Sequence, residues 1–278
     1  MTFLSVLLVL ALVQWWGSGA PLQKDGWFSR YIARLDAWPG RSRGRCHLLL
    51  AVLAPTLLLW LLCWWLARES STVWILIISV PVLLYSLGRG DFSAQVGAYI
   101  EASERGDSVS AANQLERLQG AGESSVMASD WGELHRQALR AVAYRSCERM
   151  FAVIFWFLVL GPAGALMYRL SVLYRERLDT RSAARWLWLL EWPVVRLLGL
   201  TWAMAGNFDS CFPRCQNHLT NRNKSSAALL YDMLLGALGR PPVSQNEVDL
   251  DAVRASQPLF SRSLLLWVSV LALITLLA

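Results

Sequence analysis

The chain has 278 residues, of which 55% are hydrophobic and 17% are charged, and its mean hydropathy is +0.37. This balance excludes an ordinary water-soluble globular domain. The net charge of +6 does not indicate nucleic-acid binding, because the basic residues gather beside apolar blocks, where they set membrane topology. The composition predicts an all-α, polytopic helical protein of the inner membrane, with the lipid bilayer as its first partner.

Residues 1–88 are predicted to form an N-terminal membrane region with three spans, at residues 3–20, 47–66 and 72–87. The first block is interpreted as an uncleaved anchor and not as a signal peptide, because no basic residue precedes Lys24. The arginine-rich linker after it is expected to be cytoplasmic. The second and third blocks form a membrane hairpin, in which neighbouring helices compensate for Pro81.

Residues 89–149 are more polar and are predicted to form a small cytoplasmic helical domain. Phe92, Val96 and Tyr99 recur at helical spacing, which indicates one amphipathic helix, and similar patterns follow twice. Two glycines, Gly120 and Gly122, break the pattern within residues 119–125. Three helices are therefore expected here.

Residues 150–206 are predicted to form a broken-helix membrane insert. The uncharged block 150–168 is interrupted by Gly161-Pro162-Ala163-Gly164, and arginines follow at Arg169, Arg175, Arg177, Arg181 and Arg185. A full crossing would place these arginines outside, against the positive-inside bias, whereas a re-entrant hairpin bent at the break would keep them inside. The block 186–205 either crosses as well or lies at the interface, so the sequence leaves both blocks open as spans.

Residues 207–262 are predicted to be a cytoplasmic polar segment and residues 263–278 a C-terminal span, which brings the firm spans to four. Cys211, Cys215 and His218 have spacings that could supply metal ligands. A fourth ligand at zinc-site spacing is missing, so a structural loop is the preferred interpretation and no metal site is expected. The five cysteines are expected to be reduced thiols.

The sequence shows no phosphate loop, nucleophile elbow or zinc-protease helix, so catalytic residues stay unknown. The broken helix is more informative, because a guanidinium at membrane depth suits an anionic ligand or a buried carboxylate. Glu191 is the nearest candidate counter-ion for Arg169. In the alternative interpretation, Arg169 extends to the interface, and Glu191 and Arg196 form a structural pair. The ligand-binding candidates are Gly161, Pro162, Gly164, Tyr168, Arg169, Glu191 and Arg196.

Two segments of the insert resemble motifs of the CobD/CbiB superfamily of cobalamin-pathway membrane proteins. They are Gly161-Pro162-Ala163-Gly164-Ala165 with Tyr168-Arg169, and Glu191-Trp192-Pro193-Val194-Val195-Arg196-Leu197. Within that superfamily the chain is most similar to the AmpE family of bacterial inner-membrane proteins, which is associated with β-lactamase induction. The similarity extends over nearly the whole chain, with further support from Tyr85-Ser86-Leu87-Gly88-Arg89 and Gly206-Asn207-Phe208.

The resemblance implies a regulatory or sensory role in β-lactamase induction and the response to β-lactam antibiotics. It also implies an anionic cell-wall-derived ligand or another membrane protein as partner, and no cofactor is identified. The ligases of the superfamily follow Tyr-Arg with Asn-Thr-Leu-Asp, where this chain has Val172-Leu173-Tyr174-Arg175. The missing amide and carboxylate argue against ATP-dependent amide formation, which stays as the alternative. A transporter of muropeptide-like anions is a further alternative, suggested by the broken helix.

Overall fold

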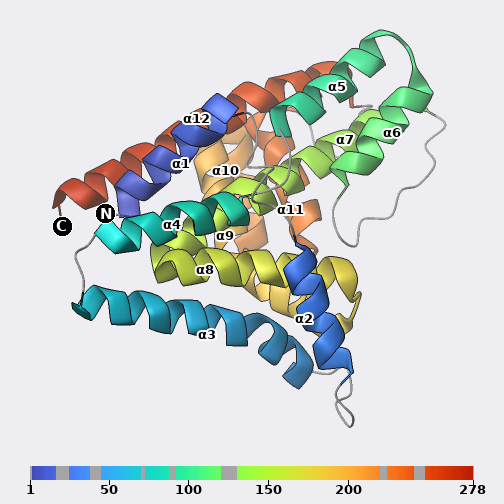
Figure 1. Ribbon diagram of the computed structural model, residues 1–278. Coiled ribbons are helices and arrows are strands. Elements are labelled where there is room, and N and C mark those ends of the chain that lie inside the picture. The colour runs from blue at the N-terminus through green and yellow to red at the C-terminus, as the bar shows by residue number, and fades with distance from the viewer. Residues whose placement is uncertain are drawn as a thin grey trace. The chain divides into compact units, whose positions relative to one another are not determined.

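A computed structural model describes residues 2–16, 25–37, 45–69, 73–87, 92–119, 130–219, 224–240 and 248–277 (Figure 1). Helices joined by turns make up these ranges, and no β-strand occurs in them. The all-α prediction is therefore confirmed. The chain divides into two compact units. Unit 1 contains Met1–Gly90 and Ala152–Leu190, and unit 2 contains Asp91–Phe151 and Glu191–Ala278.

Unit 1 is built around one long helix of the insert. Helix α8 packs against α3 and α4, as Figure 1 shows, and α1 packs against α4. The short helix α2 contacts α3. The helices of this unit are α1 (Thr2–Trp16), α2 (Gly26–Asp36), α3 (Arg45–Glu69), α4 (Val73–Ser86), α8 (Ala152–Arg177) and the part of α9 (Arg181–Ala205) that ends at Leu190.

Unit 2 is built around a helix that precedes the insert. Helix α7 packs against α6, α11 and α12, while α5 pairs with α6 and α10 pairs with α11. A π-helical turn, η1, continues α7. The elements of this unit are α5 (Phe92–Glu104), α6 (Ser108–Leu118), α7 (Trp131–Ser146), η1 (Cys147–Phe151), the rest of α9, α10 (Phe208–Leu219), α11 (Ser226–Ala237) and α12 (Leu250–Leu277).

The three helices expected between residues 89 and 149 are present as α5, α6 and α7. Asp107 begins α6 as its N-cap, because its carboxylate accepts hydrogen bonds from the backbone N–H and the hydroxyl of Ser110. The predicted break at residues 119–125 lies almost entirely outside the described residues. The cytoplasmic location of these helices stays a prediction.

In the described part of the chain, three helical stretches are long and apolar enough to cross a membrane, namely Cys46–Arg68, Trp131–Arg177 and Leu250–Leu277. Large apolar side chains on them face outward, such as Leu58, which is 69% exposed, and Leu276, which is 83% exposed. Apolar surface of this kind is typical of contact with lipid and not with water. The protein is therefore a membrane protein, whereas the count of four spans stays a prediction. Helices α1 and α4, expected to span, have 15 and 14 residues in the described part.

The predicted polar segment 207–262 is helical over much of its length, and the predicted span 263–278 lies within a longer helix that begins at Leu250. The helix extends beyond the predicted span for a physical reason. The hydroxyls of Ser256 and Ser263 donate to the carbonyl groups of Val253 and Leu259 within the same helix. Polar residues whose hydrogen bonds close locally do not end a helix.

Candidate functional site

The break predicted in the insert lies at Gly161, inside α8. Its φ of 67° and ψ of −155° are not helical, and a positive φ favours glycine because it lacks a Cβ. Pro162 follows directly, at the start of the next helical arm, where its missing N–H leaves no helical hydrogen bond unmade. The Gly-Pro pair thus ends one helical arm and starts another.

The chain folds back on itself at this break. A Cβ on Gly164 would lie 2.1 Å from the carbonyl oxygen of Trp156 and 2.7 Å from the Cβ of Leu160. Residues eight positions apart in a straight helix are separated by about 12 Å along the axis, so the arm after Gly161 returns along the arm before it. We call Ala152–Arg177 the Gly161 hairpin. Glycine at position 164 permits the close approach of its two arms.

Arg169 lies on the returning arm of the Gly161 hairpin and is buried. Its Nη2 donates to Oδ2 of Asp25 over 3.4 Å, with side-chain exposures of 7% and 10%. The other carboxylate oxygen of Asp25 accepts a hydrogen bond from the Tyr85 hydroxyl at 3.0 Å. Trp27 Nε1 donates to that same hydroxyl oxygen at 3.1 Å. Arg169 is therefore neutralised by a carboxylate at the start of α2 instead of extending to an interface.

The other end of α2 is tied to the same arm through a histidine. Asp36 Oδ1 lies 3.3 Å from Nε2 of the buried His47. Nδ1 of His47 shares a hydrogen bond of 3.0 Å with the hydroxyl of Tyr174. Because Arg169 and Tyr174 both belong to the returning arm, the carboxylates at the two ends of α2 are both linked to that arm.

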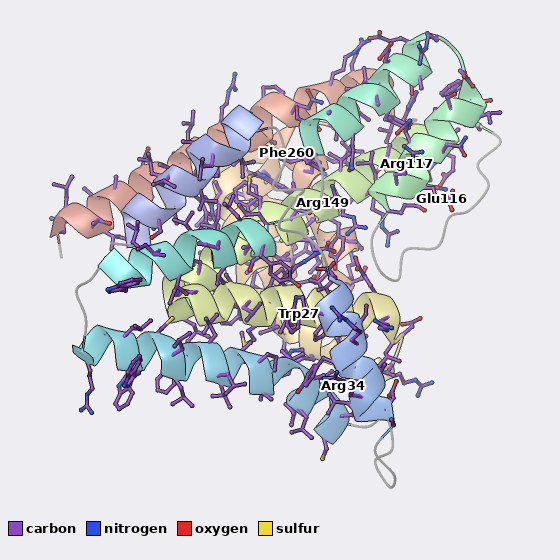
Figure 2. The ribbon with its side chains drawn as sticks, in the orientation of Figure 1. Trp27, Arg34, Glu116, Arg117, Arg149 and Phe260 are labelled. Atoms are coloured by element: carbon purple, nitrogen blue, oxygen red, sulfur yellow. The ribbon has the colours of Figure 1, made fainter. Side chains whose placement is uncertain are left out.

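Helix α2 is amphipathic between these two anchors. Phe28, Ile32 and Leu35 form its buried face. Trp27 and Arg34, labelled near its opposite ends in Figure 2, are exposed. The Tyr31 hydroxyl donates to the carbonyl oxygen of Leu50 and holds α2 against α3. Helix α2 is thus held by one apolar face and by polar contacts at both of its ends.

Unit 2 has a separate buried polar cluster around η1. Glu191, which is 3% exposed, accepts a hydrogen bond of 2.7 Å from the Tyr144 hydroxyl. Arg145 pairs with Glu148 and donates to the carbonyl oxygens of Leu118 and Gln119 at the end of α6. The buried charges of this cluster are therefore paired or hydrogen-bonded, as burial requires. A π-helical turn at such a cluster is a frequent feature of functional sites.

Arg196 lies on α9 in the same unit and is partly exposed. Its guanidinium stacks over the Trp192 ring, 4.1 Å from the ring centre. It also donates to the carbonyl oxygens of Trp192 and His218. Arg196 thus closes contacts within α9 and between α9 and α10.

Comparison with known proteins places the chain in a family. Residues 1–278 match the family described as "Regulatory signalling modulator protein AmpE". The chain belongs to the AmpE family. A stretch of 181 residues is 30% identical to "Cobalamin biosynthesis protein CobD" of Stutzerimonas stutzeri (strain A1501), over 60% of this chain and 55% of that protein. The AmpE-family chain thus spans about half the length of this curated relative. No solved structure matches.

The sequence-predicted residues of the AmpE-family chain fall into both units. Gly161, Pro162, Gly164, Tyr168 and Arg169 belong to unit 1, whereas Glu191 and Arg196 belong to unit 2. The described partner of Arg169 is Asp25, and that of Glu191 is Tyr144. Sequence reasoning missed Asp25 and Tyr144 as members of the site. Asp25 was visible only as an acidic residue in a basic linker, which is a weak indication of a buried ion pair.

Proposed function

We propose that this AmpE-family protein is a multi-pass regulatory or sensory protein of the bacterial inner membrane. We propose that it acts in β-lactamase induction and in the response to β-lactam antibiotics. The family's description as a regulatory signalling modulator supports a regulatory role. The observation that carries the proposal is the buried Arg169, whose counter-ion comes from the short helix α2. Such an ion pair can be exchanged for a ligand.

The guanidinium of Arg169 suits an anionic ligand because its donors are only partly used. Within the described residues its Nη2 contact with Asp25 is long, at 3.4 Å, and its Nε has no hydrogen-bond partner. A carboxylate or phosphate can accept two parallel hydrogen bonds from such a fork. An anionic cell-wall-derived molecule would therefore replace Asp25 with a fuller set of hydrogen bonds.

Replacement of Asp25 by the ligand would produce a signal by releasing the start of α2. Asp25 is the residue before α2, and its carboxylate also holds Tyr85, so its release frees the start of that helix. A ligand shifts an equilibrium only by its difference in affinity for the two states. Here the difference is that Arg169 is blocked by Asp25 when α2 is docked and open when α2 is released. A second membrane protein would then read the position of α2.

The test compares β-lactamase induction in a bacterium with an inducible β-lactamase before and after deletion of the gene. We expect the deletion to change the enzyme activity reached after exposure to a β-lactam, and wild-type protein to restore it. Arg169→Met should fail to restore it when induction is compared at an equal amount of protein in the membrane. Arg30→Met removes an exposed cation from α2 and is the matched control, which should restore induction. An unchanged induction curve in the deletion strain would rule out the proposal.

A second candidate function is the ATP-dependent formation of an amide on an anionic substrate, favoured by the stretch similar to a CobD protein. The segment Val172-Leu173-Tyr174-Arg175 opposes it, because it lacks a carboxylate, and because the Tyr174 hydroxyl is already bonded to His47. Purified protein should be incubated with ATP and a phosphorylated amino alcohol, and ADP release measured. ADP release that depends on the amine would establish the ligase, and its absence would leave the regulator.

A further inference from the structure

Three sulfur atoms meet between α9, α10 and α11 in unit 2. Sγ of Cys211 and Sγ of Cys215 lie 3.8 Å apart on one face of α10. A Cβ on Gly199 would lie 2.2 Å from Sδ of Met233 and 3.2 Å from Sγ of Cys215. The thioether of Met233 and the thiol of Cys215 therefore share the space that the missing side chain of Gly199 leaves open, and the Cys211 thiol lies 3.3 Å from the carbonyl oxygen of Met233.

We propose that Cys211, Cys215 and Met233 form a binding site for a soft monovalent metal ion, Cu(I). Two thiolates on one ion, with metal–sulfur bonds of about 2.3 Å, lie roughly 3.8 to 4.0 Å apart, which matches the spacing of the two cysteines. Two thiolates and a thioether are soft ligands of the kind that Cu(I) prefers. Sequence analysis expected a loop at this position, but both cysteines lie on a helix, one turn apart.

The donor set distinguishes this site from a zinc site. Zinc is held by Cys, His, Asp and Glu side chains, and in the described part of the chain no three of these are placed to share an ion. His218, the third residue of the sequence pattern, instead contacts Asp232, with 2.6 Å between Nε2 and Oδ2. The third donor is thus the buried thioether of Met233, which zinc sites do not use.

The exposure of the two thiols suits entry of the ion from one side. Cys211 is buried and Cys215 is partly exposed, so the ion meets Cys215 first. Binding replaces both S–H bonds by metal–sulfur bonds and releases two protons to solvent, so affinity should rise with pH.

The experiment uses the full chain in detergent, reduced and without oxygen, and measures transfer of Cu(I) from its coloured complex with bathocuproine disulfonate. Wild-type protein should take up one Cu(I) per chain. Cys215→Ser and Met233→Leu should each weaken Cu(I) binding by more than about tenfold. Replacement of a residue that only supports a metal ligand already lowers metal affinity by about that factor. The matched control, Cys46→Ser with Cys63→Ser, removes two thiols outside α10 and should bind as the wild type does.

Unchanged binding in Cys215→Ser, or loss of binding in the control, would overturn the site. Unchanged binding in Met233→Leu would overturn the role of the thioether. A second measurement uses wild-type protein only, so it does not depend on whether the variants fold. In wild-type protein, Cu(I) should protect Cys215 from alkylation by N-ethylmaleimide and leave the exposed Cys46 reactive, as read by mass spectrometry of peptides. Equal alkylation of Cys215 with and without Cu(I) would contradict the proposal.

Discussion

Arg169 and Asp25 form a buried ion pair, although 144 positions separate them in the sequence. The pair joins the start of α2 to the returning arm of the Gly161 hairpin. Because a charge taken out of water must be compensated, each partner makes the burial of the other possible. The same contact is therefore a structural link, and in the proposed function it is also the contact that a ligand has to displace.

A double-mutant cycle tests this pair. Asp25→Asn and Arg169→Met should each lower the free energy of unfolding by about 3–5 kcal/mol, because each leaves an unpaired charge or a lost partner in a buried position. The double variant should lose less than the sum of the two, with a coupling of about 0.5–3 kcal/mol. Unfolding is followed by titration with a denaturing detergent in mixed micelles.

The matched control is the pair Arg105 and Glu101, whose side chains are 62% and 67% exposed. Its coupling should stay below about 1 kcal/mol, because water screens an exposed pair. Equal coupling energies in the two cycles would show that Arg169 and Asp25 do not interact as a buried pair.

The candidate site could be predicted from sequence only up to its local part. The Gly-Pro-Ala-Gly break and the cation after it are visible because the backbone rules for glycine and proline act within a few residues. The partner of Arg169 was not predictable, since no spacing rule connects residue 25 with residue 169. Glu191 was suggested instead because it is a charge inside an apolar block, but its described partner is Tyr144.

For the fold as well, local features could be predicted from the sequence and long-range packing could not. The helical class and the helices α5, α6 and α7 were predicted because amphipathic spacing is a local property. Helix α10 was missed, since a loop was preferred at Cys211, Cys215 and His218, yet α10 continues through Pro213 and the packing of α11 covers Cys211. Such packing is decided by segments far along the chain and overrides local preference.

Two glycine substitutions are expected to have opposite effects on stability. Gly161→Ala forces a Cβ onto a backbone with φ of 67° and should cost about 1–3 kcal/mol. Gly97→Ala is the matched control, because Gly97 lies inside α5 and a Cβ there meets nothing within 4 Å. It should stabilise the protein by up to about 1 kcal/mol, since alanine favours helix. The free energy of unfolding is measured for both variants. A loss in Gly97→Ala similar to that in Gly161→Ala would contradict the assigned conformation of Gly161.

The Gly161 hairpin predicts membrane sidedness. Because the returning arm runs back along the first arm, residues after α8 should lie on the same side as the helices before α7. In protein without Cys46, Cys63 and Cys215, single cysteines introduced at the exposed positions Val109 and Asp179 report the two sides. A membrane-impermeant maleimide should label both in inside-out vesicles and neither in spheroplasts. Labelling of the two cysteines from opposite sides would show that the insert crosses the membrane.

Tyr99 predicts how stability falls at high pH. Its side chain is fully buried in α5, and its hydroxyl shares a hydrogen bond of 2.9 Å with Nδ1 of His135. Burial raises the pKa of Tyr99 from 10.0 to about 12. A folded-state pKa above the unfolded value gives stability that is complete below pH 10.0 and is lost as the pH rises toward about 12. The loss should amount to roughly 2–3 kcal/mol.

Tyr99→Phe isolates this contribution from the other alkaline transitions. The variant should be less stable than wild type near neutral pH by about 1 kcal/mol, because the hydrogen bond to His135 is gone. Its free energy of unfolding should then fall less steeply than that of the wild type above pH 10. Tyr31→Phe, in unit 1, is the comparison: burial also raises the pKa of Tyr31, but this side chain is only partly buried, so the variant should stay closer to the wild-type slope than Tyr99→Phe does. If Tyr99→Phe kept that slope as well, ionisation of Tyr99 would not be the cause, since the only group removed is its hydroxyl.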